Sequence, residues 1–287
     1  MSTTSTTFNP VKVALGTIGF VLTIGTLYSV FNSTYLDTSD PLLAHLPHPL
    51  QSTDYFANKS NPLNTVFIKK AWGWTSGGFA LLYVASPPGI RSWNRLLQYV
   101  IVTLAWLAFT GWFFGPPLIE RVVVASGGQC VVAVPVSGEI INVPIEYCYT
   151  RSSLSPATHP TLFSSVATGF TTANPWSARP RLRKGHDVSG HIFLLTMSVL
   201  FLADQITHSF KSTVWKPIHN LAVTANVVLI AIWVFATYTT AIYFHTPFEK
   251  LTGFRTLLFS CLANPTLTYR FPQLLVFPPS ASLKSHH

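Results

Sequence analysis

Two histidine residues lie at the ends of two consecutive apolar segments. His191 closes the segment 185–191 (GHDVSGH), where the first apolar run begins, and His245 closes the segment 243–245 (YFH), where the next run ends. If the two runs form antiparallel helices, both histidines lie on the same face. One imidazole could then attack phosphorus while the other protonates the departing oxygen, since both tasks suit a side chain whose pKa is near ~6.5.

A cluster of four cations precedes this first helix. Within six residues the chain carries Arg179, Arg181, Arg183 and Lys184. The free N–H groups and the positive dipole end of a helix N-terminus favour an anion, and arginine can bind phosphate oxygens in a bidentate manner. The pattern predicts a phosphate or diphosphate site. The alternative is that the cluster only contacts lipid headgroups at the membrane interface.

Four further residues could support the histidines. Asp187 or Ser189 can cap the helix, and Gly190 lets the backbone come close to a ligand because it has no Cβ. Glu249 follows His245 by four residues and could orient its ring if the helix continues. Asp187 precedes the other histidine by four residues and could do the same.

A metal site is an alternative use of the same residues. His186, His191 and His245 could ligate a metal together with Asp187. His186 and His191 are five residues apart, however, which differs from the i, i+4 spacing of helical metal pairs. The nine acidic residues are scattered, which disfavours a carboxylate cage. We therefore expect no metal and no cofactor.

The composition indicates an all-α integral membrane protein. Charged residues make up 9% of the 287 residues and apolar residues 48%, whereas a soluble globular protein carries about 25% charged residues. The net charge of +9 fits contact with anionic lipid or an anionic substrate. No recognition motif indicates nucleic acid.

About six segments are apolar enough to span a bilayer as helices, which takes ~20 residues each. We predict one polytopic membrane domain over residues 1–287, with a long luminal loop at 116–188 between the third and fourth spans. The predicted spans are 13–31, 71–86, 96–114, 190–206, 221–244 and 254–277.

The orientation of these spans rests on two glycosylation sequons. Asn32 and Asn58 begin the N-x-S/T sequons of the chain, and both lie in the first loop, which favours a luminal loop. Both termini are then cytosolic, and the histidines and the long loop are luminal. The positive-inside rule disagrees, because this orientation leaves seven Lys and Arg residues cytosolic and eleven luminal.

The long loop has structure of its own. The mainly apolar stretches 130–136 and 139–145 flank Ser137 and Gly138, as in a small β-hairpin, so we expect a cap over the site. Cys130 and Cys148 share this loop and could form a disulfide. With Cys261 they are the three cysteines of the chain, too few for a zinc site or a disulfide framework.

Two blocks of the sequence resemble the fat-storage-inducing transmembrane (FIT) family. The first is 185–196 (GHDVSGHIFLLT), and the second is 240–245 (TAIYFH), followed by Glu249, Lys250 and Gly253. The resemblance extends from Lys184 to about Phe254, and the rest of the chain is similar in layout.

The resemblance implies a hydrolase of the endoplasmic reticulum membrane, similar to the lipid phosphate phosphatases and associated with lipid droplet formation and phospholipid homeostasis. Its implied reaction cleaves the phosphoric anhydride of fatty acyl-CoA, giving acyl 4′-phosphopantetheine and adenosine 3′,5′-bisphosphate. It implies that His191 and His245 are the catalytic pair, with His245 as nucleophile and His191 as acid by analogy with lipid phosphatases.

The chain departs from the lipid phosphatase pattern at three places. That pattern has Ser-Arg some six or seven residues before the nucleophilic histidine, where this chain has Tyr238 and Thr239. Glu249 replaces an aspartate, and Arg179 with Pro180 matches the first motif only loosely. The phosphate-binding residues are therefore less defined by the resemblance than the histidines.

Two other functions fit parts of the sequence. One is a phosphatase acting on phosphatidic or lysophosphatidic acid. The other is a non-catalytic protein that binds membrane lipids, diacylglycerol and triacylglycerol among them, and partitions neutral lipid into droplets. The sequence favours catalysis on fatty acyl-CoA, because a neutral lipid needs neither paired histidines nor four cations.

Overall fold

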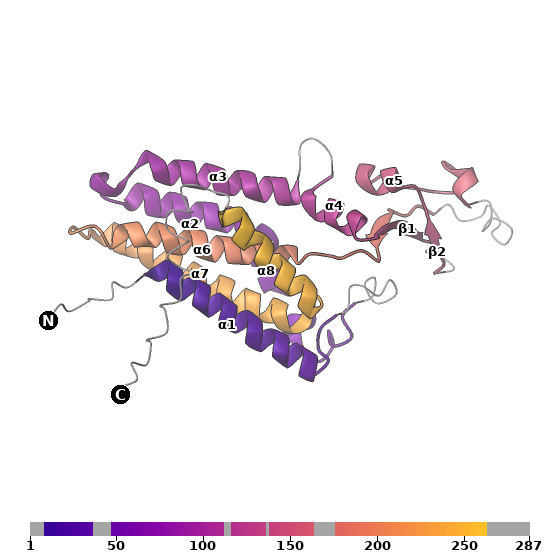
Figure 1. The fold of residues 1–287 in the computed structure, drawn as a ribbon, viewed down its shortest axis with the longest axis horizontal. Coiled ribbons are helices and arrows are strands. Elements are labelled where there is room, and N and C mark those ends of the chain that lie inside the picture. Colours follow the sequence, from indigo (N-terminus) through magenta and orange to yellow (C-terminus); the bar gives the residue numbers. More distant parts are fainter. Residues whose placement is uncertain (1–8, 37–46, 112–115, 136–137, 164–175, 263–287) are drawn as a thin grey trace, which may run out of the picture.

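A bundle of long helices extends along the molecule (Figure 1). In this computed structural model the described residues are 9–36, 47–111, 116–135, 138–163 and 176–262. The bundle helices among them are α1 (Pro10–Phe31), α2 (Ala71–Ala85), α3 (Trp93–Thr110), α6 (Gly190–Ser209) and α7 (Pro217–Tyr243). Short 3₁₀ or π turns lie at Tyr55–Ala57, Leu63–Phe67, Ile68–Lys70, Pro88–Ile90 and Pro160–Phe163.

Helix α6 lies in the centre of the bundle. It packs against α1, α2, α3 and α7, and against the shorter helix α8 (Pro247–Leu262). In its most apolar window 78% of the residues are buried, compared with 28% in α1 and 33% in α7. The outer faces of α1 and α7 expose large apolar side chains such as Phe20 and Val228. These faces suit contact with lipid acyl chains.

Local sequence explains where the bundle helices begin. Pro10 and Pro217 occupy the first turns of α1 and α7, where the missing proline N–H costs no helical hydrogen bond. The side chain of Asn9 accepts hydrogen bonds from the first N–H groups of α1, and Ser189 accepts one from Ile192 in α6. Both contacts satisfy N–H groups that a helix leaves unpaired.

The predicted spans agree with the described helices in part. Helices α1, α6 and α7 are long and apolar enough to cross a membrane. Helices α2 and α3 coincide with the second and third predicted spans, although 112–114 lies outside the described residues. The sixth predicted span, 254–277, overlaps α8, which begins at Pro247, and its part from 263 onward is not described. Six spans therefore remain a prediction.

A small α/β cap lies at one end of the bundle, beyond α4 (Leu118–Ala125) (Figure 1). Its strands are β1 (Gln129–Ala133), β2 (Ile140–Asn142) and β3 (Arg181–Arg183), antiparallel in the order β2-β1-β3. The predicted hairpin is thus confirmed as β1 and β2, with Val132 opposite Ile141. The third strand, β3, was not predicted. A core that includes Val132, Leu154 and Phe163 holds the cap together.

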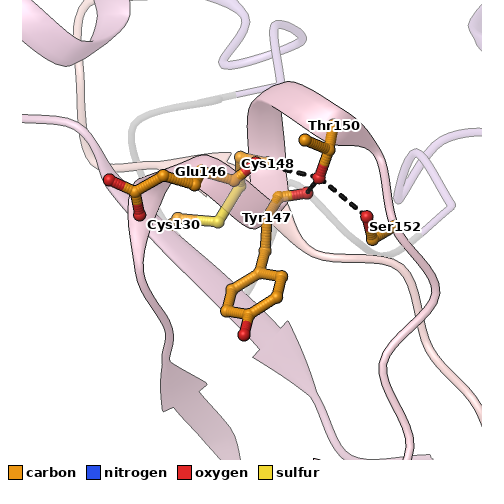
Figure 2. Close-up of a disulfide and its surroundings, with 6 residues drawn as sticks. All are labelled: Cys130, Glu146, Tyr147, Cys148, Thr150 and Ser152. Atoms are coloured by element: carbon orange, nitrogen blue, oxygen red, sulfur yellow. Dashed lines mark hydrogen bonds between the residues drawn. A yellow bond between two sulfur atoms is a disulfide. The ribbon is translucent and has the colours of Figure 1, made fainter. Parts of the chain in front are cut away.

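A disulfide fastens helix α5 (Ile145–Thr150) to strand β1. Cys130 and Cys148 are bonded (Figure 2). At the end of α5, the Thr150 hydroxyl donates to the Glu146 carbonyl and shares a hydrogen bond with Ser152. Disulfides persist mainly in oxidising compartments. This bond therefore favours a luminal position for the loop that carries the cap.

Candidate functional site

A cavity of about 740 Å³ lies where the cap meets the start of α6 and the end of α7. His191, in the first turn of α6, lines it together with His245, which follows α7. The antiparallel arrangement of the two helices therefore brings the two histidines into one site. Thr239 and Thr240 from the last turns of α7 and Phe244 complete this part of the wall.

His245 is held with its ring against two carboxylates. Its Nδ1 lies 3.5 Å from Oε2 of Glu249 and 4.0 Å from Oδ2 of Asp187. Its backbone is left-handed, with φ of 63°, a conformation that few non-glycine residues adopt. Because Nδ1 faces the carboxylates, Nε2 is the ring nitrogen available to the cavity. A carboxylate beside Nδ1 suits the tautomer that carries its proton on Nδ1 and leaves the Nε2 lone pair for attack.

Glu249 also caps the start of α8. Its Oε2 accepts a hydrogen bond of 2.8 Å from the Thr246 N–H, and its own N–H donates to the Thr246 hydroxyl at 3.4 Å. This reciprocal pair is a capping box. The carboxylate is buried and lies at the positive end of the α8 dipole, which stabilises its charge. The helix cap thus fixes the group that faces His245.

Asp187 approaches His245 from the loop between β3 and α6. Burial raises the pKa of Asp187 above its ordinary value, and the nearby His245 opposes that shift. The following residues tie this loop to α8, because the Ser189 N–H donates to the Glu249 carbonyl at 3.2 Å. Gly253 makes this approach close, since a Cβ there would lie 2.6 Å from the Ser189 carbonyl oxygen.

The last three carbonyls of α7 accept hydrogen bonds from side chains of other segments. A helix leaves its final carbonyls without partners, so these contacts close the end of α7. They fix the backbone directly before His245. The pairs are Lys250 Nζ to Ala241 O at 2.6 Å, Thr34 Oγ1 to Ile242 O at 2.9 Å, and His48 Nε2 to Tyr243 O at 2.9 Å.

Lys250 is the charged member of this group. Its side chain is only 1% exposed, and its ammonium also donates to the Ser29 hydroxyl at 3.0 Å and lies 5.3 Å from the Tyr35 ring centroid. A cation is favourable at the negative end of a helix dipole. Lys250 therefore joins the end of α1 to the end of α7. It directly follows Glu249, whose carboxylate faces His245.

The cavity wall is strongly positive. Among the described residues it carries seven cationic side chains and two carboxylates, Glu120 and Asp187, an excess of five positive charges. Four of the cations were predicted from the sequence. The full set is Lys59, Lys69, Arg151, Arg179, Arg181, Arg183 and Lys184.

Strand β3 presents two of these cations together. Alternate residues of a strand lie on the same face, so Arg181 and Arg183 share one face, and Leu182 between them packs against the cap core. Burial lowers the pKa of Lys59, and the charges of Arg181 and Arg183 lower it further. Three cations from two distant segments are therefore close together in the cavity.

Lys59, Lys69 and Arg151 were missed by the sequence analysis. Lys59 and Lys69 belong to the first loop, and both act electrostatically on His191. Arg151 follows α5 and forms an ion pair with Glu120 at 3.2 Å. No motif marks these residues in the sequence, because only the packing of the loops against α6 brings them to the site.

Some predicted site residues do not reach the cavity wall. The structure does not place Ser189 or Gly190 among its lining residues; Ser189 caps α6 instead. His186, which entered the metal alternative, shares a hydrogen bond of 2.8 Å between its Nε2 and the Thr252 hydroxyl and packs on Phe248. The described residues hold no group of three or more His, Cys, Asp or Glu side chains placed for a metal ion.

The arrangement can bind an anionic group and transfer phosphorus. The cations offer partners for phosphate oxygens. His245 offers a ring nitrogen with a carboxylate beside its other nitrogen, and His191 offers a second imidazole in the same cavity. A nucleophile with a partner that orients it and a nearby acid is the minimal set for covalent phosphoryl transfer.

Comparisons with known proteins identify a family and several relatives of this chain. The model of the family described as fat storage-inducing transmembrane protein matches residues 52–226 and 216–263. The chain is 29% identical to acyl-coenzyme A diphosphatase fit1 of Schizosaccharomyces pombe, over 87% of this chain and 80% of that protein. It is 28% identical to acyl-coenzyme A diphosphatase FITM2 of Xenopus tropicalis, over 80% and 79%.

The name of a further relative states no activity. Fat storage-inducing transmembrane protein 1 of Mus musculus is 26% identical to this chain, over 83% of the chain and 75% of that protein. No solved structure matches the chain.

Replacement of Lys250 tests the closure of α7. We expect Lys250→Met to lower the free energy of unfolding by about 1–3 kcal/mol, because it leaves the Ala241 carbonyl and the Ser29 hydroxyl without their donor in a buried site. Thermal unfolding of the purified protein in detergent measures the effect. Lys216→Met is the control, since Lys216 is exposed at the far end of α7. Equal unfolding midpoints for the two variants would contradict the assignment.

Proposed function

We propose that this chain, which belongs to the fat storage-inducing transmembrane (FIT) family, hydrolyses the diphosphate bond of fatty acyl-CoA. The observation that carries the proposal is one cavity that holds both histidines among an excess of positive charge. A diphosphate supplies the anion and the scissile anhydride that such a cavity requires. The relatives named acyl-coenzyme A diphosphatase support this substrate.

The proposed reaction has two steps. Nε2 of His245 attacks one phosphorus, so that a P–N bond forms and the bridging P–O bond breaks, while His191 gives a proton to the departing phosphate oxygen. His191 then accepts a proton from water as that water attacks the phosphorus. The P–N bond breaks and both histidines return to their starting states. The products are acyl 4′-phosphopantetheine and adenosine 3′,5′-bisphosphate.

Other residues support these steps. Glu249 and Asp187 keep the proton on Nδ1 of His245 and stabilise the ring as it gains positive charge. Lys59, Lys69, Arg181, Arg183 and Lys184 hold the oxygens of the diphosphate, including the charge that develops on the leaving group. Each of these roles is performed by the chain itself, so the proposed steps use no metal and no cofactor.

We place the protein in the endoplasmic reticulum membrane, with six spans, cytosolic termini and a luminal site. The disulfide of the cap supports a luminal cap. The cations of the cavity account for the excess of luminal charge that conflicts with the positive-inside rule. The acyl chain would lie between helices. The activity would support lipid droplet formation and phospholipid homeostasis, with diacylglycerol and triacylglycerol as candidate lipid partners.

Product identification separates this function from its rivals. Purified protein in detergent with EDTA is offered oleoyl-CoA and phosphatidic acid separately, and mass spectrometry identifies the products. We expect acyl 4′-phosphopantetheine from oleoyl-CoA. His245→Ala should abolish the product because it removes the nucleophile, and His191→Ala should lower kcat by about 10²–10⁴-fold because it removes the acid.

The other outcomes decide between the alternatives. Inorganic phosphate from phosphatidic acid alone would identify a lipid phosphatase. No product from either substrate, with an unfolding midpoint that shows folded protein, would favour a non-catalytic lipid-binding protein.

Glu249→Gln tests the carboxylate at His245 without removing the helix cap. Glutamine can replace glutamate in a capping box, so we expect thermal stability to change little. The lost charge should lower kcat for oleoyl-CoA about tenfold or more, because losing about 1.4 kcal/mol of transition-state support for the positive ring lowers the rate about tenfold. Glu146→Gln is the control, since Glu146 is exposed on α5. A kcat equal to that of the control would rule out this role.

A further inference from the structure

We propose that Arg151 and Arg179 on the cap form a subsite for the 3′-phosphate of the substrate nucleotide. The inference rests on the proposed function, because it assigns a second anion site in the cavity where the diphosphate reacts. It makes these arginines specificity-determining residues: they distinguish acyl-CoA from an otherwise identical molecule without the 3′-phosphate.

The charge of the cavity exceeds what a diphosphate needs. A diphosphate diester carries one negative charge on each phosphorus, whereas the described wall has an excess of five positive charges. A phosphate monoester adds about 1.5–2 negative charges at neutral pH. The combined negative charge of the diphosphate and one phosphate monoester comes close to the net positive charge of the wall. No other group of acyl-CoA is anionic.

The cavity cations fall into two groups by the residues they are linked to. Lys59 and Lys69 act on His191, and Arg181 and Arg183 act on Lys59, so we assign this group to the reacting diphosphate. Arg179 follows Ala178, which pairs with Leu154 of the cap, and it lines the same cavity.

Arg151 and Arg179 both line the cavity, and each lies within three residues of one bridge in the cap. Leu154 and Ala178 form an antiparallel bridge, with both N–H to carbonyl hydrogen bonds at 2.9 Å. Arg151 precedes this bridge by three residues and Arg179 follows it by one. Leu154 is fully buried in the cap core, so the bridge is firmly placed.

Two further contacts position Arg151. Its guanidinium Nη2 pairs with Glu120 Oε1 at 3.2 Å, and Cys148, three residues before it, is bonded to Cys130 of β1 (Figure 2). The Arg151 side chain is 71% exposed, so the guanidinium donors that do not face Glu120 are accessible to phosphate oxygens. The subsite is built on the disulfide-bonded cap, whereas the reacting groups are built on the bundle.

A substrate that lacks only the 3′-phosphate tests the subsite. Wild-type protein in detergent is given oleoyl-CoA or oleoyl-3′-dephospho-CoA, and acyl 4′-phosphopantetheine, the product common to both, is measured. We expect kcat/KM to be at least about tenfold higher for oleoyl-CoA, because charge-assisted hydrogen bonds to the missing phosphate are lost. The double variant Arg151→Gln with Arg179→Gln should bring the ratio near one by lowering kcat/KM for oleoyl-CoA alone.

Two controls accompany this comparison. Arg121→Gln removes one arginine charge from α4 at an exposed position that does not line the cavity, so it should keep the wild-type ratio. Cleavage of the dephospho substrate by the double variant shows that this variant is folded and catalytically intact.

Each other result overturns a definite part of the account. A wild-type ratio near one, with both substrates cleaved, would remove the 3′-phosphate subsite and leave the diphosphatase function standing. A ratio that the double variant leaves unchanged would overturn the assignment to Arg151 and Arg179. Cleavage of neither substrate would overturn the proposed function, and the subsite with it.

Discussion

The closed end of α7 is the constraint on which the candidate site depends. A helix ends with carbonyls that need partners, and here donors from α8, from the segment after α1 and from the first loop supply them. The next residue but one is His245, in a left-handed conformation. The same turn starts α8, whose capping box holds Glu249 beside that ring. Fixing one helix end therefore places both His245, the proposed nucleophile, and the carboxylate beside its ring.

The remaining elements place charge around this point. The centre of the bundle is apolar α6, so cations accumulate where α6 begins and the loops meet it. The bundle contributes the histidines, and the first loop contributes Lys59 and Lys69. The cap contributes arginines on β3 and around the Leu154 bridge. In the proposed function the histidines react, the cations linked to His191 bind the diphosphate, and Arg151 and Arg179 select the substrate.

The features that could be predicted from the sequence are those that follow from apolar segments and short motifs. Sequence reasoning placed His191 and His245 on one face, because antiparallel helices dictate that geometry, and it predicted the β1–β2 hairpin. It missed Lys59, Lys69 and Arg151, because tertiary packing alone gathers them. The early start of α8 could have been predicted, since Thr246, Pro247 and Glu249 form a recognisable capping box. Strand β3 was missed because three residues with two arginines carry no apolar alternation.

The most direct test of the account is a structure of the protein with orthovanadate, which mimics phosphorus during transfer. If His245 is the nucleophile, vanadium bonds to its Nε2, with Glu249 at Nδ1, and His191 lies against the opposite apical oxygen, where the leaving group departs. Vanadium bonded to His191, or a water oxygen in the apical position with His245 turned away from the cavity, would contradict the account. The former result would exchange the roles of the histidines, and the latter would remove the covalent intermediate.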